Sequence, residues 1–447
     1  MEKESMSNPK APRRRAAGRE LTVEREPTVL VGGYRQTDLL AGEEPLAELE
    51  QLAETAGARV VGKITQNLNQ IHGATYIGSG KCAEIKELVE QTGARCVILD
   101  HDLTPAQGRN LDELIGTKIL DRTDLILDIF ATHARSRMAK VQVGLALFEY
   151  RLPRLKRLWT HLEGQKGGIG MRGGPGEKQI ETDRRRLLKQ IYDLKQELKE
   201  IEARKERTVE SRGHDYFLSC LVGYTNAGKS TLMRALTGED VLVEDKLFAT
   251  LDTKTARMRL GGGMAALLSD TVGFIRRLPH DLVASFHATL EEVRSADLLL
   301  HVVDASSPHA RGQMDAVNTV LREIGCGEKD VLTVFNKTDA VRPELEIEFR
   351  LLACEYPGSV CISALKGEGL DRLKAAVLLR ARSGAAAVTL EVHAGDGRTL
   401  AFLSTHFFED TRNLDGEWIT LTGRASPTVL EKLRAMDGAV RILSKGA

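Results

Sequence analysis

Eight residues in the second half of the chain match the pattern of a phosphate-binding loop. Glycines stand at Gly223 and Gly228, Lys229 and Ser230 follow, and the stretch lies between an apolar run and a helical pattern. Such glycines let backbone N–H groups surround a phosphate, and the helix that follows adds positive potential. The residues expected around the phosphates are Gly223, Tyr224, Thr225, Asn226, Ala227, Gly228, Lys229, Ser230 and Thr231.

Two side chains of this loop and a second motif have predictable roles. The amine of Lys229 is expected to bridge the β- and γ-phosphates and to act in catalysis, and the hydroxyl of Ser230 to bind Mg²⁺. The second motif follows a short apolar run and consists of Asp270, Thr271, Val272 and Gly273. We expect Asp270 to hold Mg²⁺ through water and the Gly273 amide to contact the γ-phosphate during catalysis. The loop after Gly273 would then change conformation with the nucleotide.

A second hydroxyl ligand for Mg²⁺ is expected between these two motifs. The nucleotide-contacting stretch predicted here is Phe248, Ala249, Thr250, Leu251 and Asp252. Within it Thr250 is the natural catalytic ligand when the γ-phosphate is present, while Thr253 and Thr255 stay open as alternatives.

A third motif, directly after the apolar run 331–335, indicates which base the bound nucleotide carries. It consists of Asn336, Lys337, Thr338 and Asp339. The Asp339 carboxylate can accept hydrogen bonds from guanine, whereas adenine would leave it unpaired at a cost of about 1–3 kcal/mol. Asn336 and Lys337 are expected to brace the loop and cover the base. Backbone contacts to the guanine carbonyl are expected from Ser363, Ala364 and Leu365.

Two positions bear on the rate of hydrolysis. Position 274 is Phe where many switch GTPases have a Gln that orients the attacking water, so we expect slow hydrolysis without a partner. Asn226 stands where potassium-activated GTPases have an Asn that helps to hold a monovalent cation. We therefore expect Mg²⁺ as cofactor, with K⁺ held by Asn226 as one alternative and a purely structural Asn226 as the other.

Composition limits the class of protein. Lys plus Arg and Asp plus Glu balance at 63 each, so affinity for nucleic acid has to come from local patches. The first twenty residues are polar and basic, and no segment approaches the roughly 20 apolar residues of a membrane span. The six cysteines are scattered without C-x-x-C pairs, which is typical of reduced thiols. We expect a monomer in the cytoplasm, with partial membrane association left open.

The elements divide the chain into five parts. Strand-like and helical runs alternate in the order expected for a parallel α/β sheet, first before residue 130 and again from about 215. The expected parts are a basic arm at 1–26, an α/β domain at 27–130, a helical hairpin linker at 131–212, a P-loop GTPase domain at 213–382 and a small α/β domain at 383–447.

The linker has an unusual composition. Seven glycines fall between Gly164 and Gly176, and the following helix carries apolar residues from Leu187 to Ile201 at heptad spacing. We expect two antiparallel helices with a glycine-rich loop at the tip. Cationic and aromatic residues able to contact RNA are Arg151, Arg154, Lys156, Arg157, Trp159, Arg172 and Lys178. The residues alone leave a solvated hairpin equally open.

Several of these stretches together resemble the HflX family of ribosome-associated GTPases over about residues 28–380. They are TYIGSGK, LTPAQGRNL, LDRTDLILDIF, LPRL, GGIGMRGGPGEKQIETDRRR, GYTNAGKS, LFATLD and DTVGF. The resemblance implies a Ras-like GTPase domain and binding to the large ribosomal subunit and its RNA, in separating stalled or idle ribosomes under stress. The chain departs from the family pattern at Gly173–Lys178, where the family more often has one glycine before the proline.

Two functions from different classes follow. The first is a GTP-hydrolysing switch, cycling between GTP and GDP, that engages ribosomal RNA through the hairpin. The second is a nucleotide-gated scaffold that regulates a protein partner and uses the heptad positions as its docking surface. A third class, the tRNA-modification GTPases, lacks support because no cysteine or cofactor motif for such chemistry is present.

Overall fold

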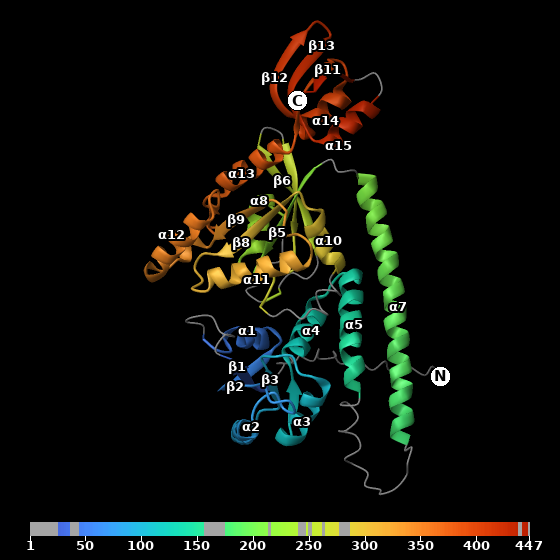
Figure 1. Ribbon diagram of the computed structural model, residues 1–447. Helices are drawn as coiled ribbons and strands as arrows, with labels where there is room; N and C mark the ends of the chain where they lie inside the picture. Colours follow the sequence, from blue (N-terminus) through green and yellow to red (C-terminus); the bar gives the residue numbers. More distant parts are fainter. Residues whose placement is uncertain are drawn as a thin grey trace, which may run out of the picture.

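The protein has three α/β domains and a helical hairpin (Figure 1). The computed structural model describes residues 26–35, 44–155, 175–212, 216–239, 247–248, 253–261, 264–276, 287–436 and 440–445. Among these residues no helix combines the length and the apolar character needed to cross a membrane.

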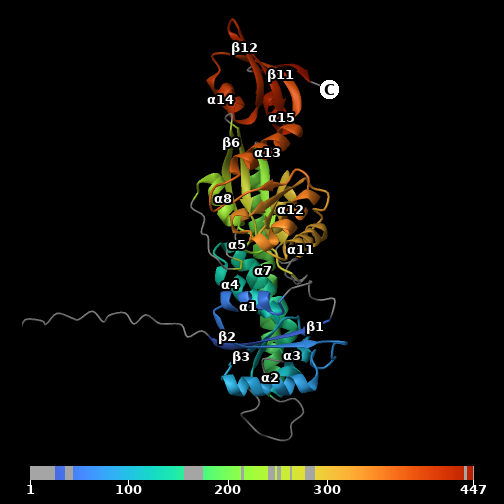
Figure 2. The same cartoon turned by 90° about the vertical axis from the view of Figure 1, so that its left-hand side faces the viewer.

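The N-terminal domain is a four-stranded parallel sheet in the order β2-β1-β3-β4. Its central strands are buried because helices cover both faces. Helices α2 and α3 pack on the face away from the GTPase domain, and α1 and α4 pack on the face toward it (Figure 2). The elements are β1 (Glu26–Tyr34), α1 (Ala47–Thr55), β2 (Ala58–Asn67), α2 (Ser79–Thr92), β3 (Cys96–Leu99), α3 (Pro105–Ile115), β4 (Lys118–Leu120) and α4 (Arg122–His133).

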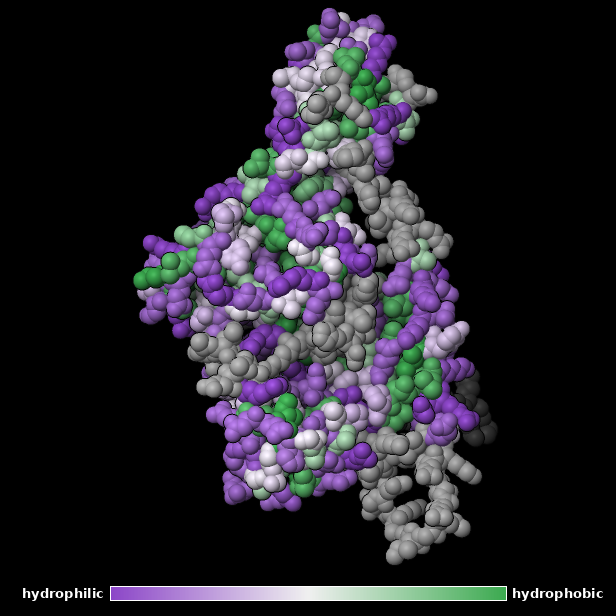
Figure 3. Space-filling model, viewed as in Figure 1, coloured by the Kyte–Doolittle hydropathy of each residue, from purple (hydrophilic) through white to green (hydrophobic). Residues whose placement is uncertain are grey.

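The linker is a pair of antiparallel helices that lie side by side in Figure 1. They are α5 (Arg137–Arg151), followed by η1 (Leu152–Arg154), and the long α7 (Pro175–Arg212). Apolar residues of α7 at the predicted heptad positions turn toward α5, and Ile191 is buried. Figure 3 shows the resulting hydrophobic band along the hairpin, flanked by hydrophilic surface. The predicted helical hairpin is therefore confirmed.

The GTPase domain has a six-stranded sheet in the order β10-β9-β8-β5-β7-β6, in which only β6 runs antiparallel to its neighbour. Strand β5 lies between β8 and β7, and the carboxyl ends of β5, β7 and β9 meet at one edge of the sheet. The elements are β5 (Phe217–Gly223), α8 (Lys229–Thr237), β6 (Lys254–Gly261), β7 (Met264–Asp270), α10 (His287–Ser295), β8 (Leu298–Asp304), α11 (Ala310–Glu323), β9 (Val331–Asn336), η2 (Thr338–Ala340), η3 (Pro343–Leu345), α12 (Glu346–Glu355), β10 (Val360–Cys361) and α13 (Leu370–Ser383).

The C-terminal domain is a small antiparallel sheet in the order β12-β13-β11-β14. Its chain order is β11 (Ala386–His393), α14 (Gly397–His406), β12 (Phe408–Asp415), β13 (Trp418–Ala425), α15 (Pro427–Ala435) and β14 (Val440–Lys445). This βαββαβ order is the split βαβ arrangement. The domain lies at the far end of the GTPase domain from the N-terminal sheet (Figure 2). The predicted fold class is confirmed, with the antiparallel C-terminal sheet as the detail that the sequence did not specify.

Candidate functional site

The predicted phosphate loop connects β5 to α8 at the edge where the parallel strands end. Gly223 has a φ of 151°, and a Cβ there would lie 2.3 Å from the carbonyl oxygen of Val302. Gly228 has a φ of 91°, and its Cβ would lie 2.3 Å from Nδ2 of Asn336. Both glycines are therefore required by close approach of the loop to neighbouring strands as well as by backbone conformation.

Lys229 lies at the start of α8 and is only 7% exposed. Its Nζ donates to the carbonyl oxygens of Gly223 at 3.1 Å and Tyr224 at 2.8 Å. Burial lowers the pKa of Lys229 to about 8, against the opposing effect of Asp270. Burial and Lys229 together lower the pKa of His301 to about 4, so this core histidine stays neutral. An anionic phosphate would favour the charged form of the lysine and raise its pKa again.

Ser230 and Asp270 come together from α8 and the end of β7. The Ser230 hydroxyl donates to Oδ2 of Asp270 at 2.7 Å, and Asp270 is fully buried. Mg²⁺ prefers such hard oxygen donors and commonly takes one or two protein ligands besides phosphate and water. The donor set thus fits the predicted Mg²⁺ site, although no cluster of three or more acidic, His or Cys side chains occurs among the described residues.

Asn336 joins the base-recognition loop to two other loops. Its Nδ2 donates to the carbonyl oxygen of Ala227 at 2.9 Å, and its Oδ1 accepts from the backbone N–H of Ala364 at 3.0 Å. The side chain of Asn336 therefore connects the loop at Ala227 with the loop at Ala364. The motifs 223–230, 336–339 and 363–365, predicted separately, form one site.

The neighbours of Asn336 are held by contacts with other parts of the GTPase domain. Lys337 adopts a left-handed conformation with φ of 59°, and its Nζ pairs with Asp304 at 2.7 Å. The Thr338 hydroxyl donates to the carbonyl oxygen of Ile362 at 3.0 Å. Asp339 on η2 is exposed, and Leu365 is 78% exposed. The loop is therefore braced from below, while the acidic side chain is left accessible to a base.

The segment after Asp270 lies directly on the phosphate loop. The N–H of Phe274 donates to the carbonyl oxygen of Gly223 at 3.1 Å, and the N–H of Thr225 donates to the carbonyl oxygen of Phe274 at 2.8 Å. The two hydrogen bonds form a short parallel bridge. A Cβ at Gly273 would lie 2.9 Å from Cα of Thr225 and 3.0 Å from Nζ of Lys229. The Phe274 side chain is buried in the core and offers no polar group to water.

The stretch around Thr250 is only partly described. Ala249, Thr250, Leu251 and Asp252 lie outside the described residues, so the predicted ligand role of Thr250 stays a prediction. Both alternatives are engaged elsewhere: the Thr253 hydroxyl donates to Glu292 at 2.8 Å, and Thr255 lies in β6 with its hydroxyl 2.8 Å from that of Ser269. This arrangement favours Thr250.

The predicted RNA-binding residues fall into two groups. Lys156, Arg157, Trp159 and Arg172 lie outside the described residues, as does the side chain of Lys178 in α7. Arg151 is exposed at the end of α5, as an RNA contact requires.

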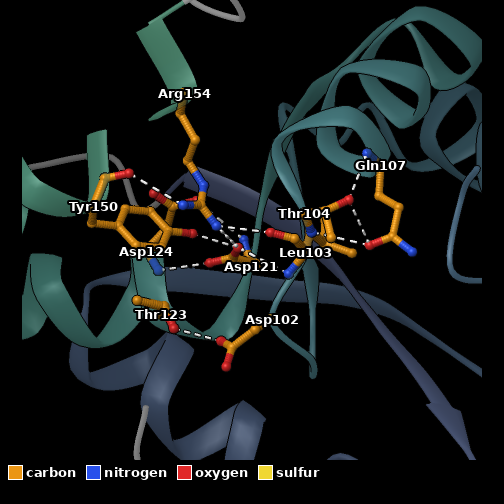
Figure 4. Close-up of polar contacts among 9 residues, drawn as sticks. All are labelled: Asp102, Leu103, Thr104, Gln107, Asp121, Thr123, Asp124, Tyr150 and Arg154. Carbon is orange, nitrogen blue, oxygen red and sulfur yellow. Dashed lines mark hydrogen bonds and ion pairs between the residues drawn. The ribbon is translucent and has the colours of Figure 1, made fainter. Parts of the chain in front are cut away.

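Arg154 departs from the RNA-contact prediction. Its guanidinium donates to the carbonyl oxygens of Leu103 at 2.7 Å and Tyr150 at 3.2 Å and pairs with Asp121 at 3.5 Å (Figure 4). Asp121 is fully buried at the start of α4 and also accepts from the Tyr150 hydroxyl. Because the Arg154 head group is committed to these partners, the structure corrects the expected role: Arg154 fixes the hairpin to the N-terminal domain.

Sequence reasoning missed a polar junction between the N-terminal domain and the phosphate loop. The Tyr224 hydroxyl donates to Oε1 of Glu48 at 2.6 Å, and Arg122 pairs with Glu48 at 3.0 Å. Arg122 also donates to the carbonyl oxygen of Arg276 at 3.0 Å. The only local signal was an arginine at the first position of helix α4.

Comparison with known proteins agrees with this geometry. Family models described as "GTP-binding GTPase N-terminal", "GTP-binding GTPase Middle Region" and "50S ribosome-binding GTPase" match residues 43–131, 133–212 and 219–337. The GTPase HflX of Magnetococcus marinus is 45% identical over 87% of this chain and 90% of its own length. The GTPase HflX of Escherichia coli is 44% identical over 86% of this chain and 88% of its own.

Among solved structures, a GTP-binding protein from Sulfolobus solfataricus in complex with GDP is 26% identical, with a TM-score of 0.41 over 79% of this chain and 98% of that one. The relatives at 44–45% identity match 86–87% of the chain and carry the assignment. The protein belongs to the HflX family of GTPases and is itself a GTPase.

Proposed function

We propose that this GTPase is a nucleotide-timed ribosome factor: it binds the large ribosomal subunit and promotes dissociation or rescue of ribosomes under stress. In the proposed cycle, GTP orders the segments around Thr250 and Gly273, the hairpin engages ribosomal RNA, and hydrolysis to GDP releases the protein. The protein acts as a monomer in the cytoplasm.

The observation that carries the ribosome part is a group of exposed cations at the tip end of the hairpin. Arg151 ends α5, and three consecutive exposed arginines, Arg184 to Arg186, lie in the part of α7 toward the tip. Side-chain exposures of 78% for Arg185 and 75% for Arg186 leave both guanidinium groups accessible despite pairing with Glu181 and Asp183. Such a cluster suits the phosphates of structured RNA. The family model described as "50S ribosome-binding GTPase" supports the same partner.

At the nucleotide site, this chain's residues hold and orient the triphosphate. Lys229 and the N–H groups of the phosphate loop bind the phosphates, and Asn336 keeps the base loop at a fixed distance from them. Asp339 selects guanine. Ser230, Thr250 and Asp270 would hold Mg²⁺, which neutralises charge on the phosphate oxygens when bound. Phe274 supplies no group to orient water, so the ribosome is expected to complete the hydrolytic site.

A potassium site at Asn226 is a separate part of the proposal. Asn226 is exposed in the phosphate loop with a φ of 58°. In this position its side-chain oxygen can contribute to a cation site next to the phosphates. Equal GTPase rates in sodium and potassium buffers would remove this part and leave the rest intact.

The scaffold alternative loses its proposed docking surface. The heptad positions of α7 pack against α5, and the ion pair of Arg137 with Glu197 closes the same contact. Because Ile191 is buried and the other heptad residues are partly buried against α5, they offer a protein partner less apolar surface than an unpaired helix would.

Sucrose gradients test the function directly. We expect intact ribosomes incubated with the protein and a non-hydrolysable GTP analogue to separate into subunits, with the protein in the large-subunit fraction. A double variant Arg151→Glu and Arg184→Glu should remain mostly in the unbound fraction. The matched control is Arg350→Glu on α12, whose side chain is 74% exposed at a remote place. Unchanged sedimentation of the double variant would contradict the proposed RNA surface. Loss of binding after RNase treatment would distinguish RNA from a protein partner.

A further inference from the structure

The polar junction between the N-terminal domain and the nucleotide site holds one backbone position from both sides. We call it the clasp and define it as the side chains of Glu48, Arg122 and Tyr224 with the backbone of Arg276. The Tyr224 hydroxyl accepts from the N–H of Arg276 at 3.0 Å while donating to Glu48. Arg122 donates to the carbonyl oxygen of the same Arg276 at 3.0 Å. Arg122 of the N-terminal domain thus holds the carbonyl group of Arg276 directly, and Glu48 acts on its N–H group indirectly, through the Tyr224 hydroxyl of the phosphate loop.

The clasp is buried and charged. The side chain of Arg122 is 3% exposed and lies between the carboxylates of Glu48 and Asp100. Burial by itself lowers the pKa of Arg122, but the two carboxylates raise it above its ordinary value, so the guanidinium stays charged. Burial and Glu48 raise the pKa of Tyr224, so its hydroxyl keeps the proton that it donates. The clasp is therefore a defined arrangement of donors and acceptors with little freedom to rearrange.

Two apolar side chains of the GTPase domain also pack against the N-terminal domain, close in sequence to the predicted Mg²⁺ ligand and to the clasp. Phe248, two residues before the predicted ligand Thr250, is 2% exposed and packs edge-on against Phe130 of α4 with ring centroids 4.7 Å apart. Ile275, next to Arg276, is 1% exposed in the same core cluster as residues of α1 and α4. The N-terminal domain thus anchors residues adjoining both nucleotide-sensing stretches.

The position of Arg276 restricts where Gly273 can lie, together with the bridge between Phe274 and the phosphate loop. Asp270 is fixed in the sheet and by Ser230, and Arg276 is fixed by the clasp, so both ends of the short segment between them are held. In this conformation Gly273 packs on Thr225 beside the amine of Lys229. That amine is the group that reaches the γ-phosphate in P-loop proteins. The γ-phosphate of GTP needs this space, whereas GDP lacks the group that would enter it.

We propose that Glu48 and Arg122 are positioning residues for the GTPase: through Tyr224 and Arg276 they hold the Gly273–Arg276 segment on the phosphate loop. GTP has to displace this segment, and GDP does not. The N-terminal domain therefore sets the preference of the site for GDP over GTP, and a change in that domain's position alters the preference without touching the nucleotide. This inference concerns the isolated protein and stands apart from the proposed ribosomal role.

Equilibrium affinities of the full chain test the inference. Isothermal calorimetry with GDP and with a non-hydrolysable GTP analogue is carried out on the wild type, Glu48→Gln and Tyr224→Phe. Glu48→Gln removes the charge that pairs with Arg122 and keeps the number of heavy atoms, and Tyr224→Phe removes only the hydroxyl that contacts Glu48 and Arg276. We expect the affinity for the analogue, divided by that for GDP, to rise by about tenfold, within the usual range for coupling between sites. In steady-state kinetics of Glu48→Gln the KM for GTP should fall, and inhibition by GDP should stay constant.

The matched control is Glu50→Gln, which makes the same change on the same helix. Glu50 pairs with Lys63 at the surface, away from the clasp, so the affinity ratio should stay at the wild-type value. A ratio unchanged in both clasp variants would overturn the proposal. Affinities for GDP and the analogue that fall together would also overturn it, because the clasp would then only support the fold. Thermal denaturation confirms that each variant is folded, and Tyr224→Phe keeps the test available if Glu48→Gln does not fold.

Discussion

The side-chain amide of Asn336 donates to the carbonyl oxygen of Ala227 across 109 residues of sequence. The same side chain accepts from the N–H of Ala364, so one buried residue ties together the loops for base and phosphate. We expect Asn336→Ala to lower the free energy of unfolding by about 1–3 kcal/mol, because two buried backbone groups lose their partners. Urea denaturation measures this loss. Asn413→Ala, at an exposed position on β12, should change it far less.

The carboxylate of Asp339 is expected to determine which base the nucleotide site binds. Replacing its carboxylate by an amide in Asp339→Asn reverses the hydrogen-bonding requirement at the base, so xanthosine nucleotides should bind better than guanosine nucleotides. The expected loss of GDP affinity is roughly 10–100-fold, the value of a hydrogen bond to a charged group. Calorimetry with both nucleotides measures the preference. Glu344→Gln on the neighbouring η3 serves as the control, and an unaltered preference for guanosine in Asp339→Asn would show that the base pocket lies elsewhere.

Gly273 has no room for a side chain. A methyl group in Gly273→Ala would meet the backbone of Thr225 at 2.9 Å, and backbone cannot give way as a flexible side chain can. We expect kcat for GTP to fall at least about tenfold because the added methyl group hinders the Gly273 amide from taking the position in which it would contact the γ-phosphate. Single-turnover hydrolysis checks this. Gly397→Ala, where a Cβ meets nothing within 4 Å, should retain wild-type turnover.

Variants of Arg151 and Arg154 should separate a role in RNA binding from a role in stabilising the fold. Arg154→Ala should lower the free energy of unfolding by about 1–3 kcal/mol, since the buried carboxylate of Asp121 and the Leu103 carbonyl lose a donor. Arg151→Ala, at an exposed position, should leave stability within about 0.5 kcal/mol of the wild type and weaken ribosome co-sedimentation. Chemical denaturation and pelleting, applied to both variants, distinguish the two roles. Equal effects of the two substitutions on stability would contradict the assignment of Arg154.

The lowered pKa of Lys229 predicts a pH dependence of nucleotide binding. Without nucleotide this pKa is about 8, and bound phosphates favour the charged amine, so the complex keeps a proton that the free protein loses above pH 8. Affinity for GDP should be flat below pH 8 and decline as the pH rises beyond it. Calorimetry at pH 8.5 in buffers of different ionisation enthalpy should detect proton uptake. Absence of uptake would mean that Lys229 remains charged in the free protein.

The motifs of the candidate nucleotide site could be recognised in the sequence because each of them is local. Each motif lies at the end of a strand, and a parallel sheet brings such ends together whatever the loops between them contain. Gly223 and Gly228 could be assigned from type and spacing alone. The hairpin was predictable for a similar reason, since the apolar spacing of α7 fixes which face meets α5.

The clasp and the role of Arg154 could not be predicted because they depend on long-range contacts. Glu48 and Tyr224 are 176 residues apart, and nothing in the neighbourhood of either residue indicates the other. Arg154 lies in a basic stretch whose composition suits RNA, and only the position of buried Asp121 shows that its charge is used internally. A charged residue's partner is set by tertiary packing, which composition does not reveal.

Helix α7 has a consequence for the distance between the hairpin tip and the catalytic centre. Its 38 residues form one uninterrupted helix, roughly 57 Å long, and strand β5 with the phosphate loop follows shortly after it. The number of residues in this helix therefore determines both how far the tip extends from the phosphate loop and the direction in which the side chains at the tip point. Inserting seven residues would extend the reach by about 10 Å and turn the tip only slightly, whereas inserting two would rotate it by about 200°.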